Sequence, residues 1–203
     1  MAKSSKQWLR RHVTDPYVRR AQAEGFRSRA AYKLMEIDDK ERLLRPGTAV
    51  LDLGAAPGGW SQVAAKRVMP GGRVAAVDLL KVEPIPGVHV VQGDFRDAAV
   101  RAALGDGKVD VVVSDLSPNL SGIPGVDQAR SLELAEAALD VCRSSLKPDG
   151  AFVTKAFQGE AFHSLKKRLE AAFETVKVVK PAASRGESRE TYFVCRRCRL
   201  SPA

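Results

Sequence analysis

The chain has 203 residues with a hydrophobic fraction of 44%, which suits one domain with its own core and is short for two. It contains no run of about 18 apolar residues, as a membrane span needs, and its first residues lack the apolar core of a secretory signal, so we expect a cytoplasmic protein without membrane contact. The net charge of +9 favours a polyanionic partner, and three cysteines without a secretion signal argue against a disulfide framework.

The positive charge is concentrated at the N-terminus. Residues 1–33 hold nine basic and two acidic side chains, which places +7 of the +9 in this segment. Such a segment is typical of an electrostatic surface for nucleic acid, although a merely solvated arm has the same composition. We expect residues 1–26 to form a basic extension that docks RNA and residues 27–203 to form a single domain. The arginines expected to hold phosphates are Arg10, Arg11, Arg19, Arg20, Arg27 and Arg29.

Beyond the extension, short apolar runs alternate with segments of helical spacing. The runs predict strands at 49–53, 73–79, 88–92, 109–114 and 150–154. They are almost continuously apolar, which is typical of a parallel sheet covered on both faces. Two helical stripes lie between them, one formed by Trp60, Val63, Ala64 and Val68 and the other by Leu132, Ala135, Leu139 and Cys142. The alternation predicts an α/β, Rossmann-like doubly wound fold.

The end of the chain breaks this alternation. Residues 175–181 and 190–197 predict two strands, and the polar connection between them is too short for a crossover helix. These strands should therefore pair antiparallel, which gives a mostly parallel seven-stranded sheet ending in an antiparallel hairpin. Such a sheet is similar to that of S-adenosylmethionine-dependent methyltransferases rather than to that of dinucleotide dehydrogenases.

The turn after the first predicted strand contains the sequence G-A-A-P-G-G, from Gly54 to Gly59. Ligands of doubly wound sheets bind beyond the carboxyl ends of the strands, and glycines let the backbone approach them closely. This spacing does not fit the G-x-G-x-x-G pattern of dinucleotide binding, and Asp52 would repel a phosphate. A cationic, zwitterionic ligand suits the turn better.

Acidic residues also end the next two predicted strands. Asp78 lies twenty residues beyond Gly58, where a carboxylate can accept hydrogen bonds from ribose hydroxyls. Asp94 follows the third strand and is placed to bind an adenine amino group. Single aspartates often begin loops, but Asp52, Asp78 and Asp94 in this order indicate a nucleoside-containing cofactor.

Two further strand ends carry charged residues. Asp115 follows the fourth strand, and Lys155 ends the fifth in an apolar setting where lysine is seldom buried without a purpose. A lysine in this place could also extend its amine to solvent, but the acidic neighbours at the other strand ends favour a functional role.

Six segments in this order resemble the FtsJ-type ribose 2′-O-methyltransferases, and among them the bacterial enzymes that act on a uridine of large-subunit (23S) ribosomal RNA. The segments are RSRAAYKLMEI (27–37), DLGAAPGGWSQ (52–62), GDFRD (93–97), SDLSPNLSG (114–122), KAFQGE (155–160) and SRETYFV (188–194). The resemblance extends from about residue 5 to about residue 197. It departs mildly at Leu116, Ser117 and Leu120, and the trailing CRRCRLSPA matches nothing in it.

The resemblance implies an S-adenosylmethionine-dependent enzyme that methylates a ribose 2′-hydroxyl in the assembled or assembling subunit, releases S-adenosylhomocysteine and needs no metal. The K-D-K-E tetrad of that family falls on Lys33, Asp115, Lys155 and Glu190. Cofactor contacts are expected at Asp52, Gly54, Gly58, Trp60, Asp78, Asp94 and Asp115. A monomer is the default expectation.

The expected chemistry needs a base beside the ribose hydroxyl, in line with the methyl donor. We expect Lys155 to be this base. Burial and the second cation, Lys33, favour its neutral form, whereas Asp115 and Glu190 favour the ammonium, so the sequence leaves its protonation state open. Without the resemblance, Lys33 could equally be a solvated lysine at the edge of a helix.

Two other functions remain as alternatives. A base-modifying amino methyltransferase would carry an Asn/Asp-Pro-Pro-aromatic turn, and the sequence D-L-S-P-N after the fourth strand lacks its second proline and its aromatic residue. A non-catalytic RNA-binding or assembly factor on this fold would not need the complete tetrad. Cys195 and Cys198 have zinc-like spacing, but no second Cys/His pair completes a site.

Overall fold

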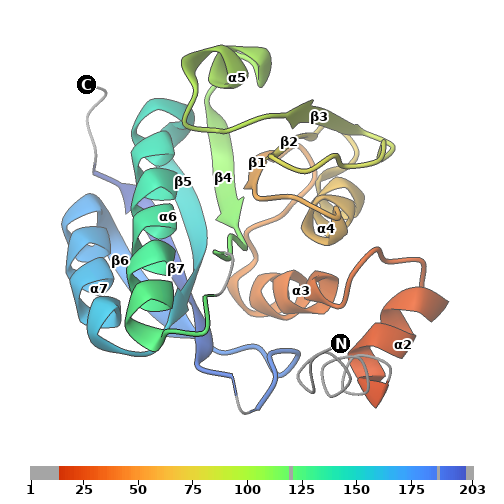
Figure 1. Ribbon diagram of the computed structural model, residues 1–203. Coiled ribbons are helices and arrows are strands. Elements are labelled where there is room, and N and C mark those ends of the chain that lie inside the picture. The colour runs from red at the N-terminus through yellow and green to blue at the C-terminus, as the bar shows by residue number, and fades with distance from the viewer. Residues whose placement is uncertain (1–13, 119–120, 187, 200–203) are drawn as a thin grey trace.

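The computed structural model describes residues 14–118, 121–186 and 188–199 and shows a sheet between two layers of helices (Figure 1). The seven strands have the order β3-β2-β1-β4-β5-β7-β6. β1 to β5 are parallel, and β7 is antiparallel to both β5 and β6. Their bounds are Ala49–Leu53 (β1), Arg73–Asp78 (β2), Val88–Gln92 (β3), Val109–Ser114 (β4), Leu146–Phe157 (β5), Phe173–Val179 (β6) and Glu190–Cys198 (β7).

The expected fold class is confirmed, including the antiparallel hairpin at the end of the chain. Two details differ. β5 starts at Leu146, before the expected residue 150, because Leu146 already pairs with Val109 before the register shifts. β3 is partly exposed on both faces rather than covered, because it is the edge strand of the sheet.

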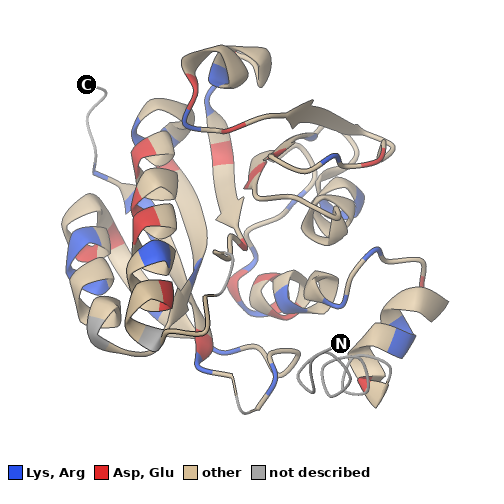
Figure 2. Ribbon diagram, viewed as in Figure 1, with Lys and Arg blue, Asp and Glu red and all other residues tan. Residues whose placement is uncertain are grey.

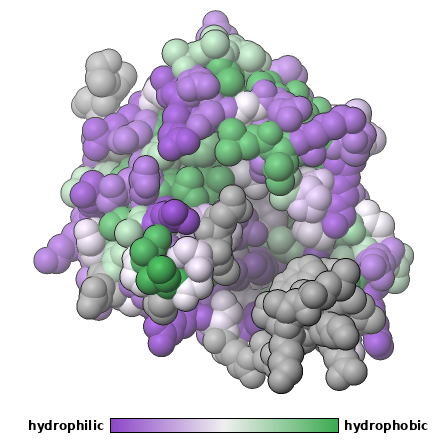
Figure 3. Space-filling model, viewed as in Figure 1, coloured by the Kyte–Doolittle hydropathy of each residue, from purple (hydrophilic) through white to green (hydrophobic). Residues whose placement is uncertain are grey.

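Six helices are described: α2 Pro16–Ala23, α3 Ala30–Glu41, α4 Gly59–Val68, α5 Ala98–Ala103, α6 Pro124–Ser145 and α7 Glu160–Ala172. Within the described ranges, no helix has the length and apolar character needed to cross a membrane. The face seen in Figure 3 is mostly hydrophilic, with hydrophobic residues gathered in smaller groups.

Alternate residues of the central strands belong to the two larger hydrophobic clusters, one on each face of the sheet. Val50, Val111 and Val153 pack with α3 and α4 on one face of the sheet. Leu51, Val112 and Phe152 lie one residue away in the same strands and pack with α6 and α7 on the other face. This alternation follows from the two-residue period of a strand. Both expected helical stripes are buried, although Leu132 is only partly so.

The end of α3 is joined to α4 by one buried carboxylate. Asp38 is 2% exposed, and its Oδ1 accepts hydrogen bonds from the backbone N–H groups of Leu43 and Leu44, each at 2.7 Å. Its Oδ2 pairs with Arg67 of α4, which also contacts the exposed Asp39 at 2.7 Å. Asp38 thus closes the C-terminus of α3 and fixes that helix against α4.

This arrangement predicts unequal effects for two neighbouring aspartates. Asp38→Ala should lower the free energy of unfolding by about 3 kcal/mol, because it leaves two buried amides without their acceptor and takes from Arg67 its buried carboxylate. Asp39→Ala removes a contact of the same arginine from an exposed site and should cost about 0.5 kcal/mol. Urea denaturation of both variants measures the difference, and equal losses would contradict the assigned role of Asp38.

Candidate active site

A buried ion pair occupies the carboxyl ends of β4 and β5. Lys155 lies near the end of β5 and is 8% exposed. Its Nζ donates a hydrogen bond to the backbone carbonyl of Asp115 at 2.8 Å and lies 3.2 Å from Asp115 Oδ1. Asp115 follows the last residue of β4 directly, so the parallel pairing of the two strands brings the lysine and the aspartate together. Two of the four tetrad residues therefore make direct contact.

The other two tetrad residues form a second ion pair. Lys33 is on α3, Glu190 is the first residue of β7, and Lys33 Nζ lies 2.7 Å from Glu190 Oε1. Both side chains are almost completely buried, with exposed fractions of 11% and 12%. Glu190 can reach this edge of the sheet because β7 is antiparallel, so its start lies opposite Phe157 at the end of β5.

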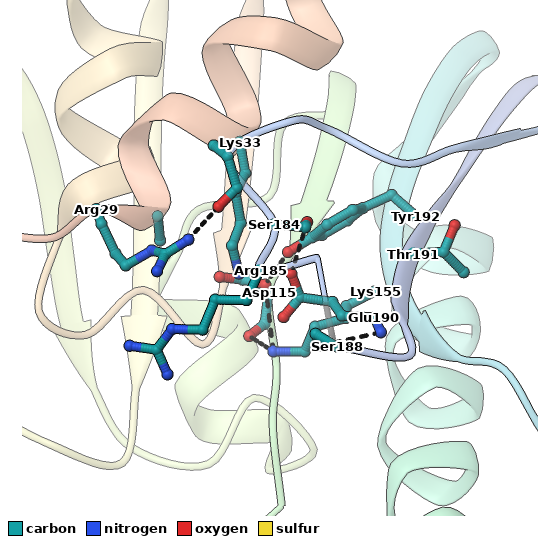
Figure 4. Close-up of polar contacts among 12 residues, drawn as sticks. Arg29, Lys33, Asp115, Lys155, Ser184, Arg185, Ser188, Glu190, Thr191 and Tyr192 are labelled. Carbon is teal, nitrogen blue, oxygen red and sulfur yellow. Dashed lines mark hydrogen bonds and ion pairs between the residues drawn. The ribbon is translucent and has the colours of Figure 1, made fainter. Parts of the chain in front are cut away.

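Tyr192 connects the two ion pairs. Its hydroxyl donates to Asp115 Oδ1 at 2.7 Å, and Lys33 Nζ lies 5.8 Å from the centroid of its ring. Figure 4 shows Lys33, Asp115, Lys155 and Glu190 converging around Tyr192 from separate segments of the chain. All four sequence-predicted tetrad residues therefore meet in one buried cluster.

The charges of the cluster keep Asp115 ionised and Tyr192 protonated. Burial opposes ionisation of Asp115, but the ammonium groups of Lys155 and Lys33 outweigh it and lower the pKa of the carboxyl. Burial and the carboxylates of Asp115 and Glu190 raise the pKa of the Tyr192 phenol well above its usual range. Asp115 is therefore a carboxylate at neutral pH, and Tyr192 remains a hydrogen-bond donor toward it.

The turn between β1 and α4 lies at the same edge of the sheet. Gly58, the N-cap of α4, has φ +113°, a left-handed conformation that L side chains rarely adopt. Gly54 has φ +77°, and a Cβ there would lie 2.4 Å from the Leu116 side chain. Glycine at position 54 thus lets the turn pack directly against the loop that follows Asp115.

The three predicted cofactor acids differ in their surroundings. Asp52 is 1% exposed and accepts a hydrogen bond from the Ser61 hydroxyl at 2.6 Å. Asp78 accepts from the backbone N–H groups of Ala56 and Leu80, each at 2.8 Å, and so bridges the glycine turn and its own loop. Asp94 pairs with Arg96, which lowers the pKa of its carboxyl against the effect of burial.

At Asp52, unlike at Asp94, the effect of burial on the pKa of the carboxyl dominates. Burial, together with the negative charges of Asp115 and Asp78, raises the pKa of Asp52 to about 7, against the lowering effect of the Ser61 hydroxyl. Asp52 is thus held close to its titration point at neutral pH, at the base of the glycine turn. A positive charge bound nearby would favour its ionised form.

Two residues with predicted binding roles, Trp60 and Arg27, donate hydrogen bonds to backbone carbonyls of the protein itself. Trp60 is 3% exposed, and its indole N–H donates to the carbonyl of Ala30 at the start of α3. Arg27 donates from its guanidinium to the carbonyls of Pro57, Glu83 and Pro84, on both sides of the glycine turn. Direct contacts of Trp60 with a cofactor and of Arg27 with RNA stay predictions.

The remaining predicted RNA ligands lie around α2 and α3. Arg19 and Arg20 are exposed on α2, whose basic residues are blue in Figure 2. Arg20 pairs with Glu24 at 2.7 Å, and Arg29 contacts Asp15 and the carbonyl of Ala183. Arg10 and Arg11 lie outside the described residues.

Sequence reasoning missed three side chains of the site. Tyr192 lies within the segment SRETYFV, where the sequence predicts only a strand. Nothing in the sequence indicates that its hydroxyl binds Asp115. Ser61 lies two residues beyond Gly59, and its contact with Asp52 depends on the turn geometry. Ser184 donates to Glu190 Oε1 at 2.9 Å from a loop that the sequence shows only as a polar connection.

The site offers groups for proton transfer and polar binding. It combines two amines, two carboxylates and a phenol, beside a glycine turn and strand ends rich in acids. Within the described part of the chain, no three His, Cys, Asp or Glu side chains form a group that could hold a metal ion. The cluster thus places a buried amine, a group that can take part in proton transfer, beside strand ends rich in carboxylates.

Comparisons with known proteins agree in one family. Residues 26–198 match the FtsJ-like methyltransferase family. The chain is 55% identical over 196 residues to a ribosomal RNA large subunit methyltransferase E of Azoarcus sp., covering 95% of this chain and 96% of that protein. It is 53% identical over 201 residues to the protein of the same name from Dechloromonas aromatica, covering 97% and 98%.

A solved structure is also similar. The crystal structure of a Plasmodium falciparum protein described as a ribosomal RNA methyltransferase superposes with a TM-score of 0.77 at 30% sequence identity. The superposition covers 87% of this chain and all of that one.

The raised pKa of Asp52 predicts a pH dependence of stability. Because the folded protein binds a proton at Asp52 that the unfolded chain has released, stability should fall as pH rises from about 4 to about 7 and then level off. The gap between 3.8 and about 7 sets an upper limit of about 4 kcal/mol for this loss. Asp52→Asn keeps an acceptor for Ser61 and should remove this part of the slope. Urea denaturation from pH 4 to pH 8 measures the free energy of unfolding of both proteins. Parallel plots of this free energy against pH would contradict the raised pKa of Asp52.

Proposed function

Because this chain belongs to the FtsJ-like methyltransferase family and is therefore a methyltransferase, we propose that it transfers a methyl group from S-adenosylmethionine to the 2′-hydroxyl of a ribose in RNA. The proposed substrate is a uridine of large-subunit ribosomal RNA in the assembled or assembling subunit. This substrate follows the names of the relatives that match nearly the full length of the chain. The proposed location is the cytoplasm.

One observation carries the proposal for a hydroxyl as the acceptor. A buried lysine contacts Asp115 beside the glycine turn, and a second buried lysine pairs with Glu190 in the same cluster. Methylation of an alcohol needs removal of a proton as the methyl group moves, and a positioned amine can accept it. A nitrogen acceptor with its own lone pair would not need this arrangement.

The residues at the strand ends fit S-adenosylmethionine. When bound, this cofactor supplies an activated methyl group on a positively charged sulfur. The N-terminus of α4 has no hydrogen bond from a capping side chain, so its backbone N–H groups can receive the carboxylate of the amino-acid part. We propose that Asp78 would accept hydrogen bonds from the ribose hydroxyls and Asp94 from the adenine amino group. The carboxylate of Asp52 would balance the positive charge of the cofactor.

In the proposed reaction Lys155 is the general base. Asp115 holds its amine at two points, through the backbone carbonyl and the carboxylate, and so fixes its direction. Lys155 would accept the proton of the ribose hydroxyl as its oxygen takes the methyl group, and the methyl–sulfur bond would break to release S-adenosylhomocysteine. Lys33 and Glu190 orient the ribose.

RNA docking is assigned to the basic extension, residues 1–26. Within its described part, Arg19 and Arg20 are exposed on α2, which packs on the domain through Tyr17 and Ala21. This helix contacts α3 through the rings of Tyr17 and Tyr32, whose centroids are 5.5 Å apart, and Lys33 of α3 belongs to the tetrad. Phosphates held by α2 would therefore bring the RNA close to the site.

The direct test supplies the purified protein with labelled S-adenosylmethionine and large subunits from cells that lack this protein. One methyl group per subunit should be incorporated, on a ribose that then resists alkaline cleavage at its 3′ side. Label on a base, or no transfer together with normal cofactor binding, would contradict the proposed function. The second of these results would favour a binding or assembly factor.

Loss of the proposed base should abolish most of the reaction. Lys155→Ala and the more nearly isosteric Lys155→Met should lower the single-turnover methylation rate by about 10²–10⁴-fold, the usual contribution of general base catalysis. Lys147→Ala is the matched control, because Lys147 is an exposed lysine at the opposite end of β5. A Lys155 variant that folds and keeps a near wild-type rate would remove the base assignment.

The docking assignment predicts a change in salt dependence. Replacing Arg19 and Arg20 with glutamine should weaken RNA binding and reduce the slope of log K against log salt by about 1 for each phosphate that the variant no longer neutralises. A control variant with Lys166→Gln and Lys167→Gln removes the same charge from α7. Equal slopes for the docking variant and the wild type, measured by filter binding, would rule out α2 as a docking element.

A further inference from the structure

The loop between β6 and β7 (residues 180–189) is attached to the N-terminal helices at several points. Glu36 of α3 accepts hydrogen bonds from the backbone N–H groups of Ala182 and Ala183, at 2.5 and 3.0 Å. Arg29, which precedes α3, donates to the carbonyl of Ala183. The backbone of residues 182 and 183 is therefore fixed by side chains from around the start of α3.

One carboxylate extends this attachment to α2. Asp15 is the N-cap of α2, with a side chain 8% exposed. It pairs with Arg29 and also contacts Arg185 Nε of the β6–β7 loop at 3.4 Å. A single acidic group thus joins the start of α2 within the basic extension, the start of α3 and the loop.

The loop in turn contacts the tetrad. Ser184 is 5% exposed, and its hydroxyl donates to Glu190 Oε1 at 2.9 Å. The same oxygen lies 2.7 Å from Lys33 Nζ. Figure 4 shows Arg29, Arg185 and Ser184 gathered next to the tetrad. Ser184 follows directly after the residue that Arg29 and Glu36 hold, so the loop contacts fix where its hydroxyl lies.

We propose that Ser184 is a positioning residue that holds Glu190 for its contact with Lys33, and that Asp15 acts through it by fixing the β6–β7 loop. This inference rests on the function proposed above. It couples the segment that docks RNA to the geometry of the reacting centre, through Arg29, the Ala183 carbonyl and the Ser184 hydroxyl.

The physical reason lies in the freedom of the glutamate side chain. Glu190 has three rotatable side-chain bonds, and one ion pair leaves several of its rotamers open. A second donor on the same oxygen, from a rigid loop, selects one rotamer before the substrate arrives. Groups that orient a catalytic residue in this way typically contribute about 10-fold to 100-fold to the rate.

The first experiment compares Ser184→Ala with Ser184→Thr, which keeps the hydroxyl. Under single-turnover conditions with saturating subunits and S-adenosylmethionine, the alanine variant should react about tenfold more slowly. The threonine variant should retain a rate close to wild type. Both should bind subunits and cofactor within about twofold of wild type, because Ser184 acts through Glu190. Ser164→Ala, at an exposed serine of α7, is the matched control.

The second experiment tests whether Asp15 acts through Ser184. Asp15→Asn remains a good N-cap for α2 but loses the charge that attracts Arg29 and Arg185. It should lower the same rate by about threefold to tenfold. The double variant with Ser184→Ala should be no slower than Ser184→Ala alone, because both changes disturb one contact.

The outcomes separate this inference from the proposed function. An inactive wild-type protein would overturn the function itself. An active wild type with a Ser184→Ala variant of equal rate would overturn the positioning role alone. Multiplicative effects in the double variant would show that Asp15 acts independently of Ser184. If Ser184→Ala does not fold, a full rate for Asp15→Asn would still contradict the coupling.

Discussion

The contact between Lys155 and Asp115 is the interaction on which the rest of the site depends. A lysine buried at the end of a central strand is unfavourable unless a counter-charge and hydrogen-bond acceptors accompany it. Asp115 provides both, because its carboxylate and its backbone carbonyl face the same amine. The arrangement requires parallel neighbours whose carboxyl ends meet, so β4 and β5 must pair in this register. Tyr192 then extends the cluster to the third strand, β7, through its contact with Asp115.

The second ion pair requires a different kind of support. Lys33 belongs to a helix rather than to the sheet, so its position depends on how α3 is fixed. Trp60 binds the first carbonyl of α3, and Asp38 joins the last turn of the helix to α4. Both contacts involve α4, the helix that starts at the glycine turn. The surface proposed to bind the cofactor and the amine proposed to orient the ribose therefore belong to one rigid unit.

The sequence predicted the sheet well because its signals are local. The glycine turn and the acids at the strand ends lie where expected, the apolar runs form strands whose bounds differ by more than one residue only at β5 and β6, and the short polar connection was enough to predict the antiparallel pair. The convergence of Lys33 and Glu190 was expected only from the family resemblance, because no local pattern relates a helix residue to the start of the last strand. The sequence indicated no role for Tyr192 or Ser184. Tyr192 contacts Asp115, 77 positions away, and Ser184 contacts Glu190, 6 positions away, and both contacts form only after folding. Arg27 illustrates the converse, because a basic residue in a basic segment gave no sign that its guanidinium would bind loop carbonyls.

The antiparallel direction of β7 also affects when the cluster can form during synthesis of the chain. During synthesis the four side chains of the cluster emerge in the order Lys33, Asp115, Lys155 and Glu190. The first five strands can pair while the ribosome is still translating, yet the partner of Lys33 comes with the strand that is made last. A nascent chain that has not reached β7 can pair Lys155 with Asp115 but leaves Lys33 without its carboxylate, and the cluster is complete only when that final strand enters the sheet between β5 and β6.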